Sequence, residues 1–296
     1  MRRLFVLLTV TIAAVLGAQI PALANLANQP IIGDLNGDGR LDRATLGRSA
    51  IGDPTCTVSV ETRKPDGTYQ APVVHSYTLP IKGELCPNMG VAVDLKGDGV
   101  TELVTTNFYG SGLVVLRKFQ PIARYDGLSF PSAIETVDFN GDGLGDIWES
   151  TDEVVNMRAL LSTKKGAIVP GPFSVCSQDG VPQHYFADFN GDGGQDLLVS
   201  RRCDYLETPG FSAEVYFGNG APKAVLTTAS SRPEVFPIDL NRDGIPDAGV
   251  IERHPDGVTV VRHFRNDGTG TFTEVPALTT LVLPARYQAP TGTAHH

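Results

Sequence analysis

The chain has 296 residues, of which 33 are acidic and 24 are basic, and its formal net charge is −9. This acidity, without a basic stripe, argues against a nucleic-acid-binding protein, because the field of the chain repels phosphate. The four cysteines form an even set, as is typical of proteins in oxidising compartments.

The first 24 residues read as a secretory signal peptide. Arg2 and Arg3 precede an apolar stretch over residues 4–18, and Ala22-Leu23-Ala24 supplies an Ala-x-Ala cleavage site. The apolar stretch is too short to span a membrane, no lipid-accepting cysteine stands at the cut, and no second apolar run exists. We therefore expect cleavage after Ala24 and a secreted protein, extracellular or periplasmic, in which residues 25–296 form a single domain.

A nine-residue phrase, Asp-x-Asn-Gly-Asp-Gly-x-x-Asp, then recurs five times. Its copies begin at Asp34, Asp94, Asp138, Asp188 and Asp239, at intervals of 44 to 60 residues. A period near 50 residues is typical of propeller blades. The sequence therefore predicts an array of similar units.

Each copy of the phrase has the composition of a calcium-binding loop. Oxygen-bearing side chains stand at positions one, three, five and nine, and glycines permit the positive φ angles of a tight wrap. Calcium accepts six to eight oxygen ligands with flexible geometry, and the backbone carbonyl at position seven adds another. No soft ligand intervenes, so zinc is not expected.

An EF-hand is the alternative for the third copy, because Glu149 stands at its twelfth position. The other copies have Thr45, Thr105, Val199 and Val250 there. The flanking segments are short β-type runs rather than amphipathic helices. The flanks therefore favour a loop between two strands.

Short apolar segments flank every copy and predict strands. They lie at 30–33, 91–93, 134–137, 184–187 and 235–238 before the phrase, and at 44–46, 103–105, 147–148, 197–199 and 248–251 after it. Third strands are expected at 57–61, 113–116, 213–217 and 258–261, and glycine turns at 65–69, 218–220 and 266–272 predict a returning fourth strand. Four antiparallel strands make a propeller blade, which buries both faces only by stacking on others.

These features resemble the FG-GAP and VCBS repeats of integrin-α-like β-propellers. The likeness covers residues 30–283, and the words Phe-Gly and Gly-Ala-Pro of that family appear fused in Phe217-Gly218-Asn219-Gly220-Ala221-Pro222. The resemblance implies an all-β fold of four-stranded blades, each with a calcium loop between its first and second strands. The length fits five blades, starting near residues 30, 90, 133, 183 and 234; a sixth blade stays open, since the first interval is long.

The resemblance also implies the calcium ligands of four loops, in which the seventh residue contributes its carbonyl. They are Asp34, Asn36, Asp38, Arg40 and Asp42; Asp138, Asn140, Asp142, Leu144 and Asp146; Asp188, Asn190, Asp192, Gly194 and Asp196; and Asp239, Asn241, Asp243, Ile245 and Asp247.

The second loop departs from the pattern. Lys96 replaces the asparagine and Glu102 replaces the last aspartate, so that the candidate ligands are Asp94, Asp98 and Glu102. We expect the Lys96 ammonium to act as a built-in cation and this site to be weak or empty. For all five loops, the metal-free alternative is an Asp/Asn/Gly-rich turn. Three carboxylates in nine positions, five times over, favour a cation.

Two disulfides are expected from Cys56, Cys86, Cys176 and Cys203, for which three pairings are possible. In a blade that runs down, up, down, up, all four positions fall on the face opposite the calcium loops. We therefore favour the sequence-near pairs, Cys56 with Cys86 and Cys176 with Cys203.

The sequence says less about function than about fold. The resemblance implies a binding or adhesion module whose partner, an extracellular glycan or protein, contacts the face opposite the calcium loops. The segments expected there are 108–110, 125–130, 201–202 and 204–205, although such aromatic residues also pack at strand ends.

The alternative is a calcium-dependent polysaccharide lyase or hydrolase. Against an enzyme, the chain has neither a His-Glu-x-x-His helix nor a Gly-x-Ser-x-Gly elbow, so no catalytic residue is assigned. The polar tail, 288–296, is expected to be disordered.

Overall fold

The computed structural model describes residues 25–26, 28–47, 55–81, 83–110, 112–151, 157–176, 183–203, 210–229, 232–254 and 258–276. The predicted signal peptide and the predicted disordered tail lie outside these ranges. All regular elements described are β-strands, and none of the described residues form a helix long and apolar enough to cross a membrane.

The strands form five antiparallel sheets, each with four strands in chain order, and the third sheet has a further two-residue strand at its edge. The first sheet is β2 (Ile31–Gly33), β3 (Asp42–Gly47), β4 (Thr55–Glu61) and β5 (Val73–Thr78), and the second is β6 (Met89–Val93), β7 (Glu102–Thr106), β8 (Gly112–Arg117) and β9 (Gln120–Asp126). The third is β10 (Pro131–Val137), β11 (Asp146–Thr151), β12 (Met157–Ser162) and β13 (Ile168–Val175). The fourth is β14 (His184–Ala187), β15 (Asp196–Arg202), β16 (Phe211–Tyr216) and β17 (Ala224–Ala229), and the fifth is β18 (Glu234–Ile238), β19 (Asp247–Arg253), β20 (Thr259–Asn266) and β21 (Phe272–Val275).

Stacking of the sheets explains the burial of their middle strands. Every residue of β7 and β11 is buried, whereas β5 and β21, at the outer edge of their sheets, are largely exposed. The largest aromatic cluster joins the third and fourth sheets, where Phe139 packs against Trp148, Phe173 and Phe186 at centroid distances of 5.5 to 6.2 Å.

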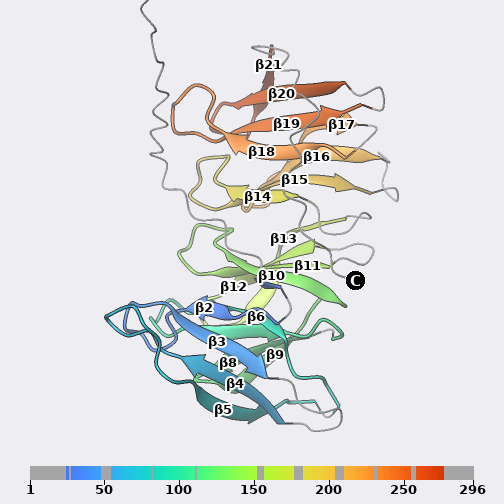
Figure 1. Cartoon of the computed structure of the whole chain (residues 1–296). Coiled ribbons are helices and arrows are strands. Elements are labelled where there is room, and N and C mark those ends of the chain that lie inside the picture. The colour runs from blue at the N-terminus through green and yellow to red at the C-terminus, as the bar shows by residue number, and fades with distance from the viewer. Residues whose placement is uncertain are drawn as a thin grey trace, which may run out of the picture.

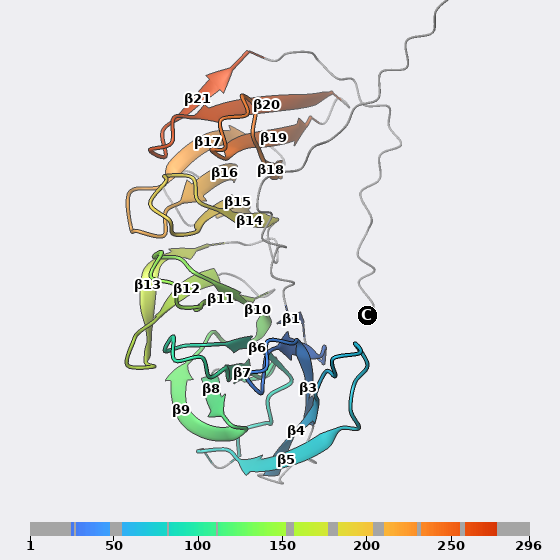
Figure 2. The same cartoon turned by 90° about the vertical axis from the view of Figure 1, so that its left-hand side faces the viewer.

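The five sheets follow one another along the molecule, from β5 at one end to β21 at the other (Figures 1 and 2). The first and last sheets therefore lie apart. The expectation of five four-stranded sheets is confirmed, while the described residues form an open array and not a closed ring.

One strand was not expected from the sequence, and three others were expected only as members of a four-stranded blade, without bounds. The third sheet gains β1 (Asn25–Leu26), which pairs antiparallel with β10 at Ile134 and Ala133. Strands β12 and β13 were not located although Gly166 marks the turn between them. Strand β9 was not located because its turn, Lys118-Phe119, contains no glycine, yet both residues have positive φ angles, of 50° and 62°.

Candidate functional site

The five acidic loops connect the first and second strands of their sheets, and the third loop contacts both the second and the fourth. A Cβ placed on Gly97 would lie 2.9 Å from Leu144 in the third loop, and one on Gly141 would lie 3.0 Å from the backbone of Gly193 and Gly194 in the fourth. The glycines at positions four and six have positive φ angles in the first four loops. In the fifth loop Arg242, at position four, adopts a φ of 63°.

The loop wraps around the carboxylate at position one, which accepts hydrogen bonds from backbone N–H groups of the loop. Asp34 Oδ1 accepts hydrogen bonds from the N–H groups of Gly37 (2.8 Å) and Asp38 (3.1 Å), and Oδ2 accepts one from Gly39 (2.7 Å). Burial opposes ionisation of Asp34, but these N–H groups outweigh it and lower its pKa. Asp94, Asp188 and Asp239 make corresponding bonds.

The carboxylate at position nine ties the loop to the sheet. Asp42, Asp146, Asp196 and Asp247 are at most 1% exposed. In each of these residues, Oδ2 accepts a hydrogen bond from the backbone N–H at position two of the same loop. Oδ1 accepts one from a backbone N–H at or just beyond the end of the third strand, at 2.7 to 2.8 Å. These donors are Arg63, Ser162, Gly218 and Asn266. Each oxygen keeps a second lone pair that a cation can use.

Burial has an electrostatic cost in the third and fourth loops. Burial raises the pKa of Asp146 and of Asp196 to about 6, because backbone N–H bonds only partly offset desolvation and the neighbouring loop carboxylates add repulsion. A nearby positive charge would therefore stabilise the ionised form of these carboxylates.

The loop residues fit a hard cation by their chemistry. Asp138 Oδ1, at position one of the third loop, is buried and accepts no hydrogen bond, as expected of a ligand oxygen. Within the described ranges, however, no three His, Cys, Asp or Glu side chains converge closely enough to hold a metal ion. Asn and backbone carbonyl oxygens make up the rest of the predicted ligand set, and the calcium ligands named from the sequence stay a prediction.

The second loop is held by a cation, but not by the one expected. Arg117, at the end of β8, donates to Asp98 Oδ2 and to Glu102 Oε1, both at 2.7 Å. The side chain of Lys96 instead lies over Gly166 in the β12–β13 turn, where a Cβ on that glycine would lie 2.3 Å from Cε of the lysine. Lys96 therefore forms no described ion pair with these carboxylates and is not the cation that bridges them, although its charge, after the hydrogen bond from Arg117, helps to lower the pKa of Asp98. A residue 19 positions beyond Asp98 fills that role, and loop spacing alone could not identify it.

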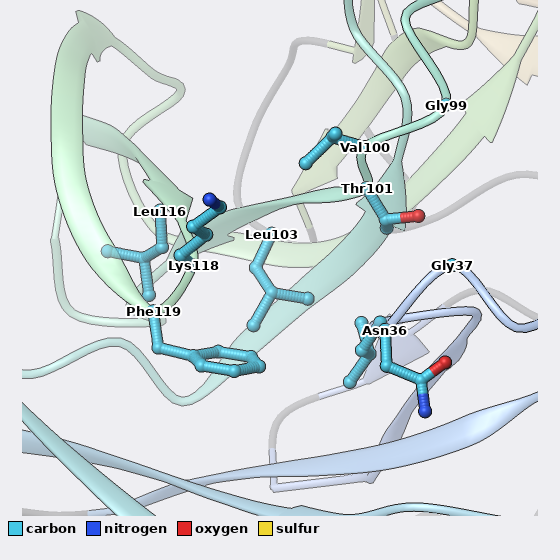
Figure 3. Close-up of a pocket in the computed structure, with 10 residues that line it drawn as sticks. Asn36, Gly37, Gly99, Val100, Thr101, Leu103, Leu116, Lys118 and Phe119 are labelled. Carbon is cyan, nitrogen blue, oxygen red and sulfur yellow. The ribbon is translucent and has the colours of Figure 1, made fainter.

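A pocket of about 280 Å³ lies between the first and second loops. Figure 3 shows Asn36 on one side of it, with Val100, Leu103, Lys118 and Phe119 on the other. Phe119 stacks on His75 of the first sheet, with centroids 4.4 Å apart. The strained Lys118-Phe119 turn thus joins the first two sheets next to the acidic loops.

Both sequence-near disulfides are confirmed. Cys56 bonds to Cys86 and Cys176 bonds to Cys203, with Cα–Cα distances of 5.5 and 5.7 Å. The first joins the first two sheets and the second joins the third and fourth, at strand ends away from the acidic loops. Two disulfides are compatible with an extracellular or periplasmic protein.

Near the Cys56–Cys86 disulfide, two short loops hold exposed aromatic side chains. Tyr109 is 69% exposed and Phe130 is 39% exposed. Phe130 has a φ of 54°, and its N–H donates to the carbonyl of Gly110 at 3.2 Å, which joins the two loops. Asn107 fixes the Tyr109 loop by donating to the carbonyl of Cys86 at 2.5 Å. The two loops are thus braced against the disulfide.

The other expected surface segment is different. Arg201 is only 2% exposed, and its guanidinium donates to both oxygens of Glu214, at 2.6 and 2.7 Å. Arg201 is therefore a core residue and not a surface contact. Residues 204 and 205 lie outside the described residues.

No protein-family model matches the chain, and no curated protein matches it. Similar solved structures include the V. cholerae biofilm matrix protein Bap1, with 18% identity over 85% of this chain and 39% of that chain and a TM-score of 0.41. A putative 6-phosphogluconolactonase from Bacteroides fragilis has 16% identity over 82% of this chain and 68% of that chain, with a TM-score of 0.43. BBS1N, in complex with ARL6DN, has 11% identity over 84% and 82% of the two chains, with a TM-score of 0.39.

The chain thus spans 39% of the length of Bap1. Similarities this distant do not assign a family, and membership among the FG-GAP and VCBS repeats stays a prediction.

Proposed function

We propose that the chain is an exported, calcium-stabilised repeat protein of the β-propeller type that binds an extracellular glycan or protein. The observation that carries the proposal is the recurrence of one carboxylate arrangement in successive sheets. A position-one carboxylate organises each loop, and a buried position-nine carboxylate joins it to the third strand. The unpartnered Asp138 Oδ1 adds support, because a buried carboxylate oxygen without a donor is costly unless a cation meets it.

Calcium would be held by the first, third, fourth and fifth loops, through side-chain oxygens at positions one, three, five and nine and the carbonyl at position seven. The bound ion supplies positive charge that offsets the repulsion among these carboxylates. The third and fourth loops lie against each other, so ions there would stiffen the contact between their sheets as well as the single loops.

Ligand binding is assigned to the face near the Cys56–Cys86 disulfide. Tyr109 and Phe130 project from loops braced by backbone hydrogen bonds, so little backbone conformational entropy would be lost on binding. The nearby Arg124 and Glu84 neutralise each other in an ion pair of 2.6 Å. Exposed aromatic rings with a polar, nearly neutral rim suit the apolar face of a sugar ring or an aromatic-rich protein contact.

The test is retention of the signal-free, calcium-loaded protein on a panel of immobilised glycans and cell-wall polysaccharides. We expect retention without release of fragments, and a loss of about tenfold or more for Tyr109→Ala, because an exposed anchor ring contributes about 1–2 kcal/mol. The matched control is Val225→Ala, which removes an exposed apolar side chain on β17 and should bind like the native protein. Retention with fragments would support the lyase or hydrolase alternative, and equal retention of both variants would remove this face from the proposal.

A further inference from the structure

Arg117, at the end of β8, makes an ion-pair contact with the second loop that no strand residue makes with the other described loops. Arg265 stands at the corresponding place in the fifth sheet, one residue beyond the Ala248–Phe264 pair, but it is exposed and forms no described ion pair. The Arg117 guanidinium bridges the carboxylates at positions five and nine, since it contacts both Asp98 and Glu102 at 2.7 Å. Glu102 is fully buried and the Arg117 side chain is 21% exposed, so the pair is partly shielded from water. The guanidinium therefore contacts the two carboxylates, at positions five and nine, that are predicted to bind the ion in the other loops.

The position-nine carboxylate is also bonded differently in this loop. In the other four loops, one of its oxygens accepts a backbone N–H from the end of the third strand. In the second loop, Glu102 Oε2 accepts the N–H of Leu95 at 3.1 Å, while Oε1 accepts the Arg117 guanidinium. The longer glutamate reaches the guanidinium, so Glu102 and Arg117 are matched substitutions.

The first loop provides the comparison, because it also contains an arginine. Arg40 pairs with Asp38, but both side chains are at least 28% exposed, and its Nε donates to the carbonyl of Arg63 rather than to Asp42. An exposed pair of this kind is weak and can open to admit an ion. The Arg117 bridge includes a buried carboxylate and cannot open without leaving that charge unpaired.

We propose that Arg117 takes the place of calcium in the second loop, so that this repeat folds without metal while the other four use it. A divalent ion would have to displace the guanidinium and would be repelled by it at close range. The inference rests on the proposed calcium binding in the other loops. It implies that the Lys118-Phe119 turn, which follows Arg117 and lines the pocket of Figure 3, keeps its position when calcium is removed.

The first test is calcium stoichiometry, measured by native mass spectrometry and calorimetry on the calcium-stripped, signal-free protein. We expect four ions for the native protein, four for Asp94→Asn and three for Asp138→Asn, which is the matched change in the third loop. Five ions for the native protein, or one ion fewer for Asp94→Asn, would overturn the inference. No ions at all would overturn the proposed function but leave the role of Arg117 to the second test.

The second test is thermal unfolding with calcium and with a chelator. Arg117→Met should lower the melting temperature by about 5–10 °C, and by the same amount in both conditions. Arg253→Met, which breaks an exposed pair with Glu234, should change it by about 2 °C or less. A native-like melt for Arg117→Met would contradict the inference.

The third test is a variant designed to gain a calcium site in the second loop. The variant Lys96→Asn, Glu102→Asp, Arg117→Thr restores the pattern of the first loop, where the register places Thr62 opposite Asp42. We expect it to bind a fifth ion. A folded variant that still binds four ions would show that something other than Arg117 keeps calcium out.

Discussion

At the scale of single residues, a network of buried charges lies in the fourth sheet. Glu214 is 1% exposed and accepts hydrogen bonds from Arg201, Lys223 and Tyr216. Burial opposes its ionisation, but the bonds from Arg201, Lys223 and Tyr216 outweigh burial and lower the pKa of Glu214. Such a network is costly to break at one member, because the remaining charges stay buried.

Glu214→Gln should therefore lower the free energy of unfolding by about 3–5 kcal/mol at neutral pH. A lowered folded-state pKa means that the ionised carboxylate stabilises the fold above the ordinary glutamate range, and that this effect is lost as the pH falls below that range and through the lowered pKa. The difference between native protein and variant should thus narrow as the pH falls below about 4 in urea titrations. The control is Glu234→Gln, whose exposed pair should contribute little; equal stability of native protein and Glu214→Gln would refute the assignment.

At the scale of the elements, small residues set the distance between neighbouring sheets. Gly33 on β2 faces Ala92 on β6, and a Cβ added to the glycine would lie 2.4 Å from the alanine Cβ. That separation is far below van der Waals contact, so β2 and β6 approach as closely as they do only because Gly33 has no side chain.

Gly33→Ala should destabilise the protein by about 1–3 kcal/mol, because the added methyl forces the two sheets apart. The double variant Gly33→Ala, Ala92→Gly moves the methyl to the other strand and should recover at least half of the loss. Chemical denaturation of the three proteins measures this, and a double variant no more stable than Gly33→Ala would show that the contact does not control the sheet spacing.

The elements also show what the sequence could and could not predict. The acidic phrase predicted five strand-loop-strand units, because carboxylate and glycine positions in a tight loop are fixed by local geometry. Strand β1 was not predictable, since its two residues have no pattern and pair with β10, more than a hundred positions away. Arg117 was missed for a similar reason: strand register, and not spacing within the phrase, brings it opposite Glu102.

At the scale of the whole molecule, stability is expected to depend on calcium. With a dissociation constant of about 0.1 mM and about 1 mM calcium, each site adds roughly 1.4 kcal/mol, or about 5–6 kcal/mol for four. A chelator should therefore lower the melting temperature by about 10–20 °C. Magnesium, which prefers stricter octahedral geometry, should restore less of it than calcium. An unchanged melting temperature in chelator would contradict the proposal that the ions stabilise the array.

The two disulfides would have a mechanical consequence under the proposed function, in which the protein holds a partner outside the cell. Each bond bypasses the chain between its cysteines, over sequence separations of 30 and 27 residues. A pulling force transmitted along the backbone would cross these bonds, so that each enclosed segment withholds about 100 Å of extensible length. The enclosed segments contain β5 of the first sheet and β14 of the fourth, which the bonds would keep from extending. The second, third and fifth sheets lie outside these segments and would resist the pull by hydrogen bonds and packing alone.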